Sequence, residues 1–340
     1  IYIVCVPTPV NSKRKPNLKY LKSACLLISK YINKNNIIIF ESTVYPGVTR
    51  NFCLPILKKN KNNIKDFYIG YGPERISPGL GKKNYEISKI VAAENKRIGN
   101  KIKKFYETFI KKVYLLESIE VAELAKNFEN CQRDLNIALM NDLYMLCEKI
   151  NINPYDVIKA CKTKWNFSHY YPGLVGGHCI SVDPYYLAYK AENLGYYPEV
   201  ILSGRRVNDN MSTFVANKMI KMLIKGGKQI MGSKILMLGI TFKENCPDIR
   251  NSKVADVYNE LKEFGLEVDV YDYEADPVEV KDEFSIDLIS EIKEKYDGIL
   301  LAVSHNKFSK IDIQSLMKDT TSVVYDLKGF LPRNLVNSRL

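Results

Sequence analysis

Short apolar runs alternate with helical stretches at both ends of this 340-residue chain, and this alternation constrains its fold more than any other feature. In the first part the apolar runs lie at 1–6, 37–40, 67–71, 89–92 and 113–116, with helical patterns such as 18–33 and 97–111 between them. Such alternation is typical of βαβ units, in which helices cover the faces of a parallel sheet. We therefore expect a Rossmann-like domain over residues 1–116.

The middle of the chain has a helical pattern. Over 117–228 apolar residues recur at spacings of three and four, with one interruption by a Gly- and Pro-rich loop from Phe167 to Pro184. After Gly226-Gly227 the βαβ pattern returns, with strands expected at 234–240, 267–271, 297–303 and 322–326. The predicted fold class is α/β, with two Rossmann-like, doubly wound domains at 1–116 and 229–340 that flank a helical middle domain.

Neither α/β section carries the Gly-x-Gly-x-x-Gly loop that cradles a dinucleotide pyrophosphate. Gly70-x-Gly72 runs into Pro73, and Gly239 has no second glycine at the required spacing. Because the chain also opens inside an apolar run, we expect the N-terminal domain to be truncated by about 60–90 residues, at roughly 30 per βαβ unit.

A formal net charge of +12 is compatible with nucleic-acid binding, but the lysines stand in short clusters such as Lys58-Lys59 rather than in one tract. Small ligands with two or more phosphates match a basic protein equally well. There is no run of eighteen apolar residues to span a bilayer, and the eight cysteines form no Cys-x-x-Cys pair. We expect a cytoplasmic protein that uses no metal, nucleic acid or membrane.

The strongest candidate for chemistry is Cys179, in the segment from Gly173 to Pro184. Three glycines in this segment let the backbone approach a ligand closely, and Asp183 follows four residues after the thiol. A nucleophilic cysteine needs an exposed, flexible setting with a proton acceptor nearby, which the other seven cysteines lack. The alternative is a small buried hydrophobic residue beside a helix N-terminus, and the local sequence favours neither reading.

A second candidate is one face of the expected long helix. Glu123, Lys126, Asn130 and Arg133 lie at spacings of three and four, so the face presents two cations and an amide that could hold an oxyanion. Such a face is more often a solvated surface. Asn130 shifts the balance toward function, because Asn is a poor helix former in a helix interior.

The ends of expected strands give two further candidates. Val6-Pro7-Thr8 and Ser42-Thr43-Val44 each follow a strand, and ligands bind at the carboxyl ends of strands in open α/β sheets. Ordinary turn chemistry is the alternative for both. In the C-terminal section the segment 242–252 occupies the same kind of position, and its Lys243 and Arg250, with an N-capping Ser252, indicate an anion site.

Together these segments resemble the UDP-glucose/GDP-mannose dehydrogenase family, most closely its UDP-N-acetylhexosamine branch of the Vi-antigen polysaccharide type. The resemblance covers essentially the whole chain, and its marks are Val6 to Pro9, Glu41 to Gly47, Tyr71 to Arg75, Ala122 through Asn141, Thr163 to Phe167, Gly173 to Tyr186 and Arg205 to Asn210.

The resemblance implies an NAD-dependent, four-electron oxidation of the C6 hydroxyl of a UDP-N-acetylhexosamine to a uronate. Cys179 would trap the C6 aldehyde and carry the resulting thioester. Lys126 and Asn130 would stabilise the oxyanion, with preorganised donors of this kind contributing roughly 3–4 kcal/mol each. Asp183 and Glu74 would move protons and direct the hydrolytic water.

The same resemblance implies two sets of binding residues. The cofactor would be bound by Val6, Pro7, Thr8, Ser42, Thr43, Val44 and Arg250. The UDP-sugar would be bound by Glu74, Arg75, Lys126, Asn130, Tyr170, Gly173, Gly176, Arg206, Phe242 and Lys243. Arg206 matches a residue that can come from a neighbouring subunit, and the expected helix from Ser118 to Ile150 is a plausible seam for a homodimer or higher homo-oligomer.

Several alternatives remain open at this point. A two-electron β-hydroxyacid dehydrogenase has the same three-part layout, with a lysine on the central helix and no thiol. A UDP-sugar-binding fragment without activity would fit the missing glycine loop. Within the family, UDP-glucose or UDP-N-acetylmannosamine is an alternative substrate, and the sequence does not separate the gluco from the galacto sugar.

Overall fold

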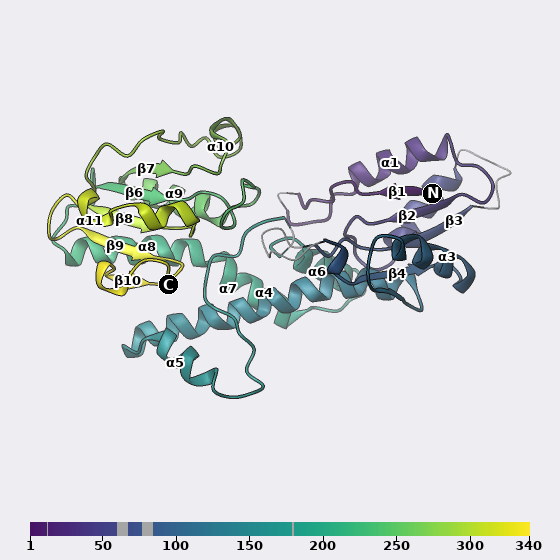
Figure 1. The fold of residues 1–340 in the computed structure, drawn as a ribbon, viewed down its shortest axis with the longest axis horizontal. Helices are drawn as coiled ribbons and strands as arrows, with labels where there is room; N and C mark the ends of the chain where they lie inside the picture. Colours follow the sequence, from purple (N-terminus) through teal and green to yellow (C-terminus); the bar gives the residue numbers. More distant parts are fainter. Residues whose placement is uncertain (12, 60–66, 77–83, 179) are drawn as a thin grey trace. The chain divides into compact units, whose positions relative to one another are not determined.

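The computed structural model describes residues 1–11, 13–59, 67–76, 84–178 and 180–340. The chain forms two compact units, and the first consists of residues 1–133 and 182–202. The second consists of residues 134–181 and 203–340. Each unit contains one five-stranded sheet (Figure 1). Helix α4, Ile119–Ile150, contributes residues to both units.

The sheet of the first unit has the order β1-β2-β3-β4-β5. Its strands are β1 Tyr2–Val4, β2 Ile37–Phe40, β3 Tyr68–Tyr71, β4 Lys89–Ala93 and β5 Val113–Leu115, which confirms the five predicted strands. Strands β1, β2 and β3 pair in parallel, but β4 runs antiparallel to β3, with Gly70 opposite Ala93. The expected parallel sheet with helices on its faces is therefore confirmed except for the direction of β4. A buried apolar run has the same pattern in either direction, so this pattern could not reveal that β4 is reversed.

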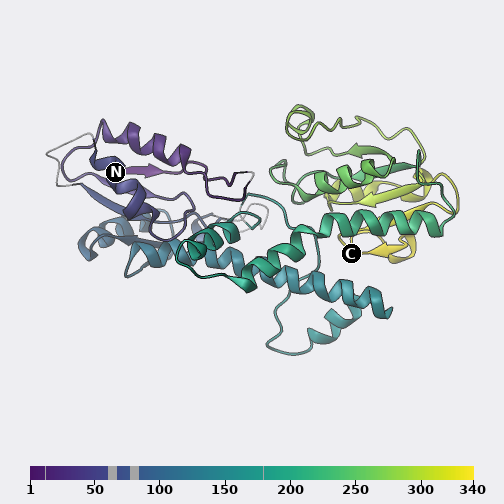
Figure 2. The same ribbon diagram turned by 180° about the vertical axis from the view of Figure 1, so that it is seen from behind.

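Helices cover both faces of this sheet. The helical elements are α1 Lys19–Ser29, η1 Thr49–Cys53, α2 Leu54–Lys58, η2 Asn84–Glu86, α3 Lys96–Glu107 and α6 Asp183–Glu192. Along β2, Ile38 and Phe40 pack in the cluster that includes α1, whereas Ile37 and Ile39 pack against α3. Figure 2 shows α1 and α3 on opposite sides of the strands. The alternation arises because successive side chains of a strand point to opposite faces.

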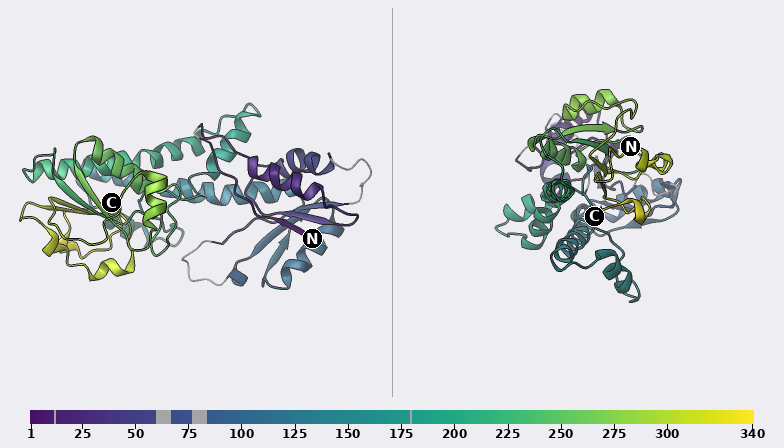
Figure 3. Two further views of the ribbon diagram at one scale, coloured as in Figure 1. Left: turned by 90° about the horizontal axis from the view of Figure 1, so that it is seen from above. Right: turned by 90° about the vertical axis from the view of Figure 1, so that its left-hand side faces the viewer.

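The second unit contains an all-parallel sheet of order β10-β9-β8-β6-β7. Its strands are β6 Lys234–Leu238, β7 Glu267–Tyr271, β8 Gly298–Leu301, β9 Val323–Asp326 and β10 Ser338–Arg339. The four predicted strands are confirmed, and β10 was too short for its periodicity to show. The surrounding helices are α8 Met211–Lys225, α9 Lys253–Glu263, α10 Pro277–Phe284, η3 Asn306–Lys310, α11 Ile313–Leu316 and η4 Arg333–Leu335. Ile235 and Met237 pack in the cluster that includes α8 and α9, while Leu236 and Leu238 pack in the cluster of the opposite layer. Figure 3 shows helices on both sides of this sheet.

The predicted helical middle is formed by α4 with α5 Pro154–Cys161, α6, α7 Glu199–Asp209 and α8. In the second unit a buried polar network joins α4 to α7. Arg205 pairs with Asp134 at 2.6 Å, and both side chains are 1% exposed. Asn208 donates to the same carboxylate at 2.7 Å. Burial raises the pKa of Asp134, and the Arg205 charge opposes that rise.

The same network reaches the Gly-rich loop. Asn141 of α4 accepts the Gly173 N–H at 2.8 Å and donates to the Gly173 carbonyl at 3.1 Å. It also donates to Asn208 at 2.8 Å. Leaving a buried amide without hydrogen-bond partners costs free energy. These bonds therefore hold the Gly-rich loop in place at Gly173.

Candidate active site

Two strand-end loops of the first unit are tied together at the carboxyl edge of its sheet. The Thr8 hydroxyl donates to the Thr43 carbonyl, and the Ser42 hydroxyl donates to the Val6 carbonyl, each at 2.7 Å. The hydroxyls of Thr8 and Ser42 are thus both engaged in hydrogen bonds within the protein. Within the part of the chain that the structure describes, the Thr43 hydroxyl makes no hydrogen bond to protein, and its residue is half-buried.

Two helices hold this pair of loops from outside the sheet. Asn127 of α4 is fully buried and donates to the Val44 carbonyl at 2.6 Å. The hydroxyl of Tyr186 on α6 donates to the Thr8 carbonyl at 2.7 Å. Pro7 is exposed between them. A fixed pair of loops at the carboxyl ends of parallel strands, with one hydroxyl uncommitted, fits a dinucleotide that lies across the sheet edge.

A buried carboxylate lies beside the face of α4 that carries Lys126 and Asn130. Asn130 donates to Asp183 at 2.5 Å, and Lys126 acts on the same carboxylate electrostatically. Asp183 is 2% exposed and Lys126 is 6% exposed. Burial raises the pKa of Asp183 to about 7, although Asn130 and Lys126 both favour the charged form. A carboxyl group that titrates near neutrality can both take and give a proton at physiological pH.

The solvated-face alternative for this part of α4 is wrong for its first two members. Glu123 is fully buried and accepts the Gly47 N–H at 2.6 Å and the Thr49 N–H at 2.9 Å. Burial raises its pKa to about 7. Arg133 is exposed, as a solvated face would require. The sequence showed the spacing of these residues but not which side of the helix faced the protein.

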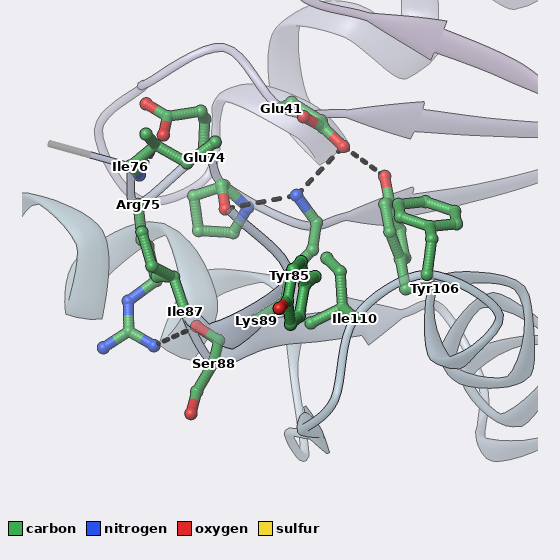
Figure 4. Close-up of a pocket in the computed structure, with 12 residues that line it drawn as sticks. Glu41, Glu74, Arg75, Ile76, Tyr85, Ile87, Ser88, Lys89, Tyr106 and Ile110 are labelled. Atoms are coloured by element: carbon green, nitrogen blue, oxygen red, sulfur yellow. Dashed lines mark hydrogen bonds and ion pairs between the residues drawn. The ribbon is translucent and has the colours of Figure 1, made fainter. Parts of the chain in front are cut away.

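A cavity of about 420 Å³ opens next to the end of β3 (Figure 4). One wall of the cavity carries an ion pair, in which Nζ of Lys89 lies 3.0 Å from Oε1 of Glu41. Glu41 follows β2, and Lys89 begins β4. The Tyr106 hydroxyl donates to the same carboxylate. Glu74 and Arg75 also line the cavity.

Arg75 is committed to protein contacts in this structure. Its guanidinium pairs with Glu129 of α4 at 2.5 Å and donates to the Ser88 carbonyl at 2.8 Å. Glu74 is exposed, and its carboxylate accepts the Ile76 N–H. Both residues therefore lie together at this cavity, with Arg75 held and Glu74 reachable from solvent.

Sequence reasoning assigned no role to Lys89 or Tyr106. The sequence contains one sign of Lys89: it is a cation at the start of an apolar run that is expected to be buried, and a buried charge requires a partner. Lys89 is 7% exposed, and Glu41 supplies that partner.

In the second unit the Gly-rich loop packs against the turn before α9. A Cβ on Gly176 would lie 2.6 Å from the Asn251 carbonyl, and a Cβ on Gly177 would lie 2.9 Å from the Phe242 ring. Gly177 also has a φ of +85°, which disfavours any other residue. The close approach at these two glycines is thus to the protein's own chain, whereas Gly173 has open space where a side chain would be.

Charged groups gather on the same turn. Arg250 is exposed and makes a bidentate contact with Asp248, at 2.9 and 2.5 Å. Nδ1 of His178 lies 3.7 Å from Oδ2 of the same carboxylate. Burial works against ionisation of Asp248, but the contacts with Arg250 and His178 hold its pKa below the usual range. Ser252 caps α9 by accepting the Val254 N–H, as its position in the sequence predicted.

The remaining candidates are placed as follows. Phe242, Lys243 and Tyr170 are half-buried, and Arg206 is exposed and donates to Ser203. Cys179 lies outside the described residues. The other candidates are therefore divided between the two units, with Asp183 in the first unit and Phe242 in the second.

Models of three domains of one protein family match the chain. The NAD binding domain of the UDP-glucose/GDP-mannose dehydrogenase family matches residues 1–110, the central domain matches 120–210, and the UDP binding domain matches 236–333. The chain belongs to the UDP-glucose/GDP-mannose dehydrogenase family, and it is an NAD-dependent oxidoreductase.

Individual relatives show which members of the family the chain is similar to. The chain is 46% identical to the UDP-N-acetyl-D-glucosamine 6-dehydrogenase of Salmonella typhi, over 100% of this chain and 81% of the relative. It is 42% identical to the enzyme of the same name from Pseudomonas aeruginosa, over 100% of this chain and 82% of the relative. The structure of a UDP-D-ManNAc dehydrogenase from Pyrococcus horikoshii superposes with a TM-score of 0.86 at 28% identity, covering 99% of this chain and 79% of that one.

The raised pKa of Asp183 gives a test of its role. If its carboxylate accepts a proton in the reaction, kcat/KM should rise as the pH increases through about 7, the pKa of the folded protein. Asp183→Asn keeps the contact with Asn130 but cannot accept the proton, so it should lower kcat by about 100-fold or more and abolish this rise. Initial rates of NADH formation across the pH range measure both effects.

The matched control is Glu120→Gln, which changes a half-buried carboxylate near the start of α4, the helix that carries Lys126 and Asn130. This variant should keep the wild-type pH profile. An unchanged acidic limb in Asp183→Asn would assign the titration to another group and remove Asp183 from the proton path.

Proposed function

We propose that this chain oxidises the C6 hydroxyl of UDP-N-acetyl-D-glucosamine to the carboxylate, with two NAD+ reduced per sugar. Two relatives that share 42% or more of their sequence with the full length of the chain carry that activity in their names. The observation that carries the chemistry is the buried group of Lys126, Asn130 and Asp183 next to two fixed strand-end loops. A buried acid that titrates near 7, with a cation and an amide beside it, suits the removal of a proton from an alcohol.

The proposed reaction begins with the alcohol. Asp183 accepts the hydroxyl proton as the C6 carbon loses a hydride. The Cys179 thiolate adds to the resulting aldehyde, loss of a second hydride gives a thioester, and water attacks this thioester to release the carboxylate and the thiol. Bound NAD supplies the hydride acceptor for each oxidation. In total one water is consumed and two hydrides and three protons are released, which balances an alcohol against a carboxylate.

The oxyanion that forms when the thiol or water adds to C6 requires donors. Lys126 and Asn130 are the proposed donors, because they lie one helical turn apart on α4 and converge on the buried Asp183. Such donors act mainly in the transition state, where charge develops on the oxygen. Glu74, exposed at the 420 Å³ cavity, is the proposed group that directs the hydrolytic water.

Binding is divided between the two ends of the chain. We propose residues 1–116 as the cofactor domain, 117–228 as the catalytic middle and 229–340 as the domain that holds UDP. Val6 to Thr8 and Ser42 to Val44 form the cofactor side, and the uncommitted Thr43 hydroxyl is its polar contact. Arg250 is the proposed contact to the cofactor pyrophosphate, since its guanidinium is exposed.

The substrate side is proposed from the second unit. Phe242 and Lys243 follow β6, and the loop from Tyr170 to Gly176 packs against the turn that follows them. Arg206, which is exposed, is proposed to contact the ligand of a neighbouring subunit. Arg75 and Glu74 lie at the cavity that would admit the sugar.

A panel of nucleotide sugars tests the proposed substrate. UDP-N-acetylglucosamine should give the highest kcat/KM, with a uronate as the product by mass spectrometry. UDP-N-acetylgalactosamine, UDP-N-acetylmannosamine and UDP-glucose should each be at least about tenfold poorer substrates. They differ from the proposed substrate by an inverted C4 hydroxyl, an inverted C2 acetamido group and a missing acetamido group, and one misplaced or missing polar group costs about 1.4 kcal/mol or more of transition-state binding. A preference for UDP-N-acetylmannosamine would instead support the second candidate, which the similarity to the Pyrococcus horikoshii structure favours.

We also propose that the protein works as a homodimer or higher homo-oligomer in the cytoplasm. No helix in the described parts of the chain is long and apolar enough to cross a membrane, and the seven described cysteines form no disulfide with one another. On α4 of the second unit, Leu139, Leu146 and Ile150 are 62%, 56% and 53% exposed, and their spacings of seven and four place them on one face. An exposed apolar stripe of this kind fits a second copy of the same helix.

Light scattering tests the assembly. The wild type should have the mass of a dimer or larger, and Leu146→Glu should shift it toward the monomer, because a charge at a buried contact loses its hydration. Val278→Glu is the control, since Val278 is 67% exposed on α10, away from this stripe. A monomeric wild type, or an unchanged mass in Leu146→Glu, would contradict the proposed seam.

A further inference from the structure

A fully buried histidine joins three loops at the carboxyl edge of the second sheet. His305 follows β8, Asp272 follows β7, and Thr241 follows β6, which lies between those two strands in the sheet order. His305 and Thr241 are 0% exposed, and Asp272 is 7% exposed. Neither the sequence pattern nor the family models drew attention to this group.

The contacts of the imidazole define its tautomer. The Asn245 N–H lies 2.9 Å from Nδ1, and because a backbone N–H can only donate, Nδ1 carries no proton. The ring proton is therefore on Nε2, which lies 3.2 Å from Asp272 Oδ2 and 3.1 Å from Thr241 Oγ1. His305 thus accepts at one end and donates at the other.

The two ends of the ring hold the same loop. The Thr241 hydroxyl donates onward to the Lys243 carbonyl at 2.9 Å. Asp272 accepts the Ile240 N–H at 2.7 Å and the Thr241 N–H at 3.3 Å. Hydrogen bonds therefore hold the 240–245 loop at three points. Asp272 binds its first two N–H groups, the Thr241 hydroxyl binds the Lys243 carbonyl, and His305 binds the Asn245 N–H.

The conformation of this loop requires such support. Asn245 has a left-handed backbone, with a φ of 53°, and its side chain accepts the Asn306 N–H at 2.9 Å. Asn adopts this region more readily than most residues, but it is still sparsely populated. Between the anchored ends lie Phe242, against Gly177, and Lys243, both half-buried. The buried bonds thus decide where the two proposed substrate contacts stand.

We propose that His305 is a positioning residue that holds the 240–245 loop, and with it Phe242 and Lys243, in the conformation that binds the uridine diphosphate part of the substrate. The inference rests on the proposed function, in which these two residues contact the UDP-sugar. His305 would touch neither the substrate nor the cofactor. Its loss should therefore weaken ground-state binding and leave the chemical step at saturation nearly unchanged.

Two substitutions by amide side chains test the roles of the two ring nitrogens of His305 separately. Asn places a carbonyl oxygen near Nδ1, so His305→Asn can still accept the Asn245 N–H. Gln places an amide nitrogen near Nε2, so His305→Gln can still donate to Asp272 but leaves that N–H without its acceptor. If the Nδ1 contact holds the end of the loop, His305→Asn should resemble the wild type more closely than His305→Gln or His305→Ala.

The experiment measures the Kd for UDP by calorimetry and the KM and kcat for the UDP-sugar, all in the full 340-residue chain. His305→Ala should raise Kd and KM by about tenfold, which corresponds to the loss of one or two buried hydrogen bonds, with kcat and the KM for NAD within about twofold of the wild type. His305→Asn should recover most of the lost affinity.

The control for general destabilisation is Val324→Ala, which removes two methyl groups from a fully buried position in β9 of the same sheet. This variant should lower the unfolding temperature and leave the Kd for UDP unchanged. A rise in Kd as large as that of His305→Ala would show that any loss of stability has this effect, and an unchanged Kd in all three His305 variants would also overturn the proposal. If the wild type itself failed to bind UDP, the proposed function would fail, which is a different result from failure of the His305 inference.

Discussion

The rest of the structure depends on a long helix, α4, whose buried side carries several polar residues among apolar ones. Along α4, Glu123, Asn127, Asp134 and Asn141 are each 0% exposed, at successive spacings of four, seven and seven that keep them on one side. The exposed side carries apolar groups, among them Phe128 at 59% and Leu139 at 62%. Burial of polar groups is unfavourable unless they are hydrogen-bonded, so each of these residues also fixes a loop or helix that supplies its partner.

This constraint explains where the catalytic candidates lie. In the first unit Glu123 fixes the turn at Gly47 and Thr49, and Asn127 fixes the strand-end loop at Val44. Lys126 and Asn130, between and beside them, are left to act on Asp183. In the second unit Asn141 fixes the loop that begins at Gly173. Within each unit, α4 thus fixes loops that carry candidate residues, through hydrogen bonds that are separate from the reacting groups.

Much of this arrangement could be predicted from the sequence. Buried strands showed as short apolar runs, and α4 was expected from 118 to 150 and spans Ile119–Ile150. The direction of β4 could not be predicted, because a run such as Lys89–Ala93 packs equally well in either direction. The orientation of α4 was equally hidden, since spacing shows that Glu123 and Lys126 share a face but not which face is buried.

The residues that sequence reasoning missed have partners distant in the chain. Lys89 pairs with Glu41, 48 positions away by number, and His305 joins Asp272 and Thr241, each more than thirty residues distant. Local patterns carry no information about such pairs. In the second unit the parallel sheet brings the ends of its strands together, and in the first unit the reversed direction of β4 places Lys89 beside the end of β2. A lone histidine or lysine next to an apolar run is the only local sign of them.

The central claim is that the chain removes four electrons from one hydroxymethyl group through a thiol intermediate. The most direct test is to count the NADH formed per UDP-N-acetylglucosamine when the sugar is limiting and NAD is in excess, for the wild type and for Cys179→Ser. The account predicts two NADH and one uronate per sugar for the wild type, and no uronate turnover for the serine variant, because an alcohol is a poor nucleophile at neutral pH. One NADH per sugar with an aldehyde or ketone as the product, or wild-type uronate formation by Cys179→Ser, would contradict it.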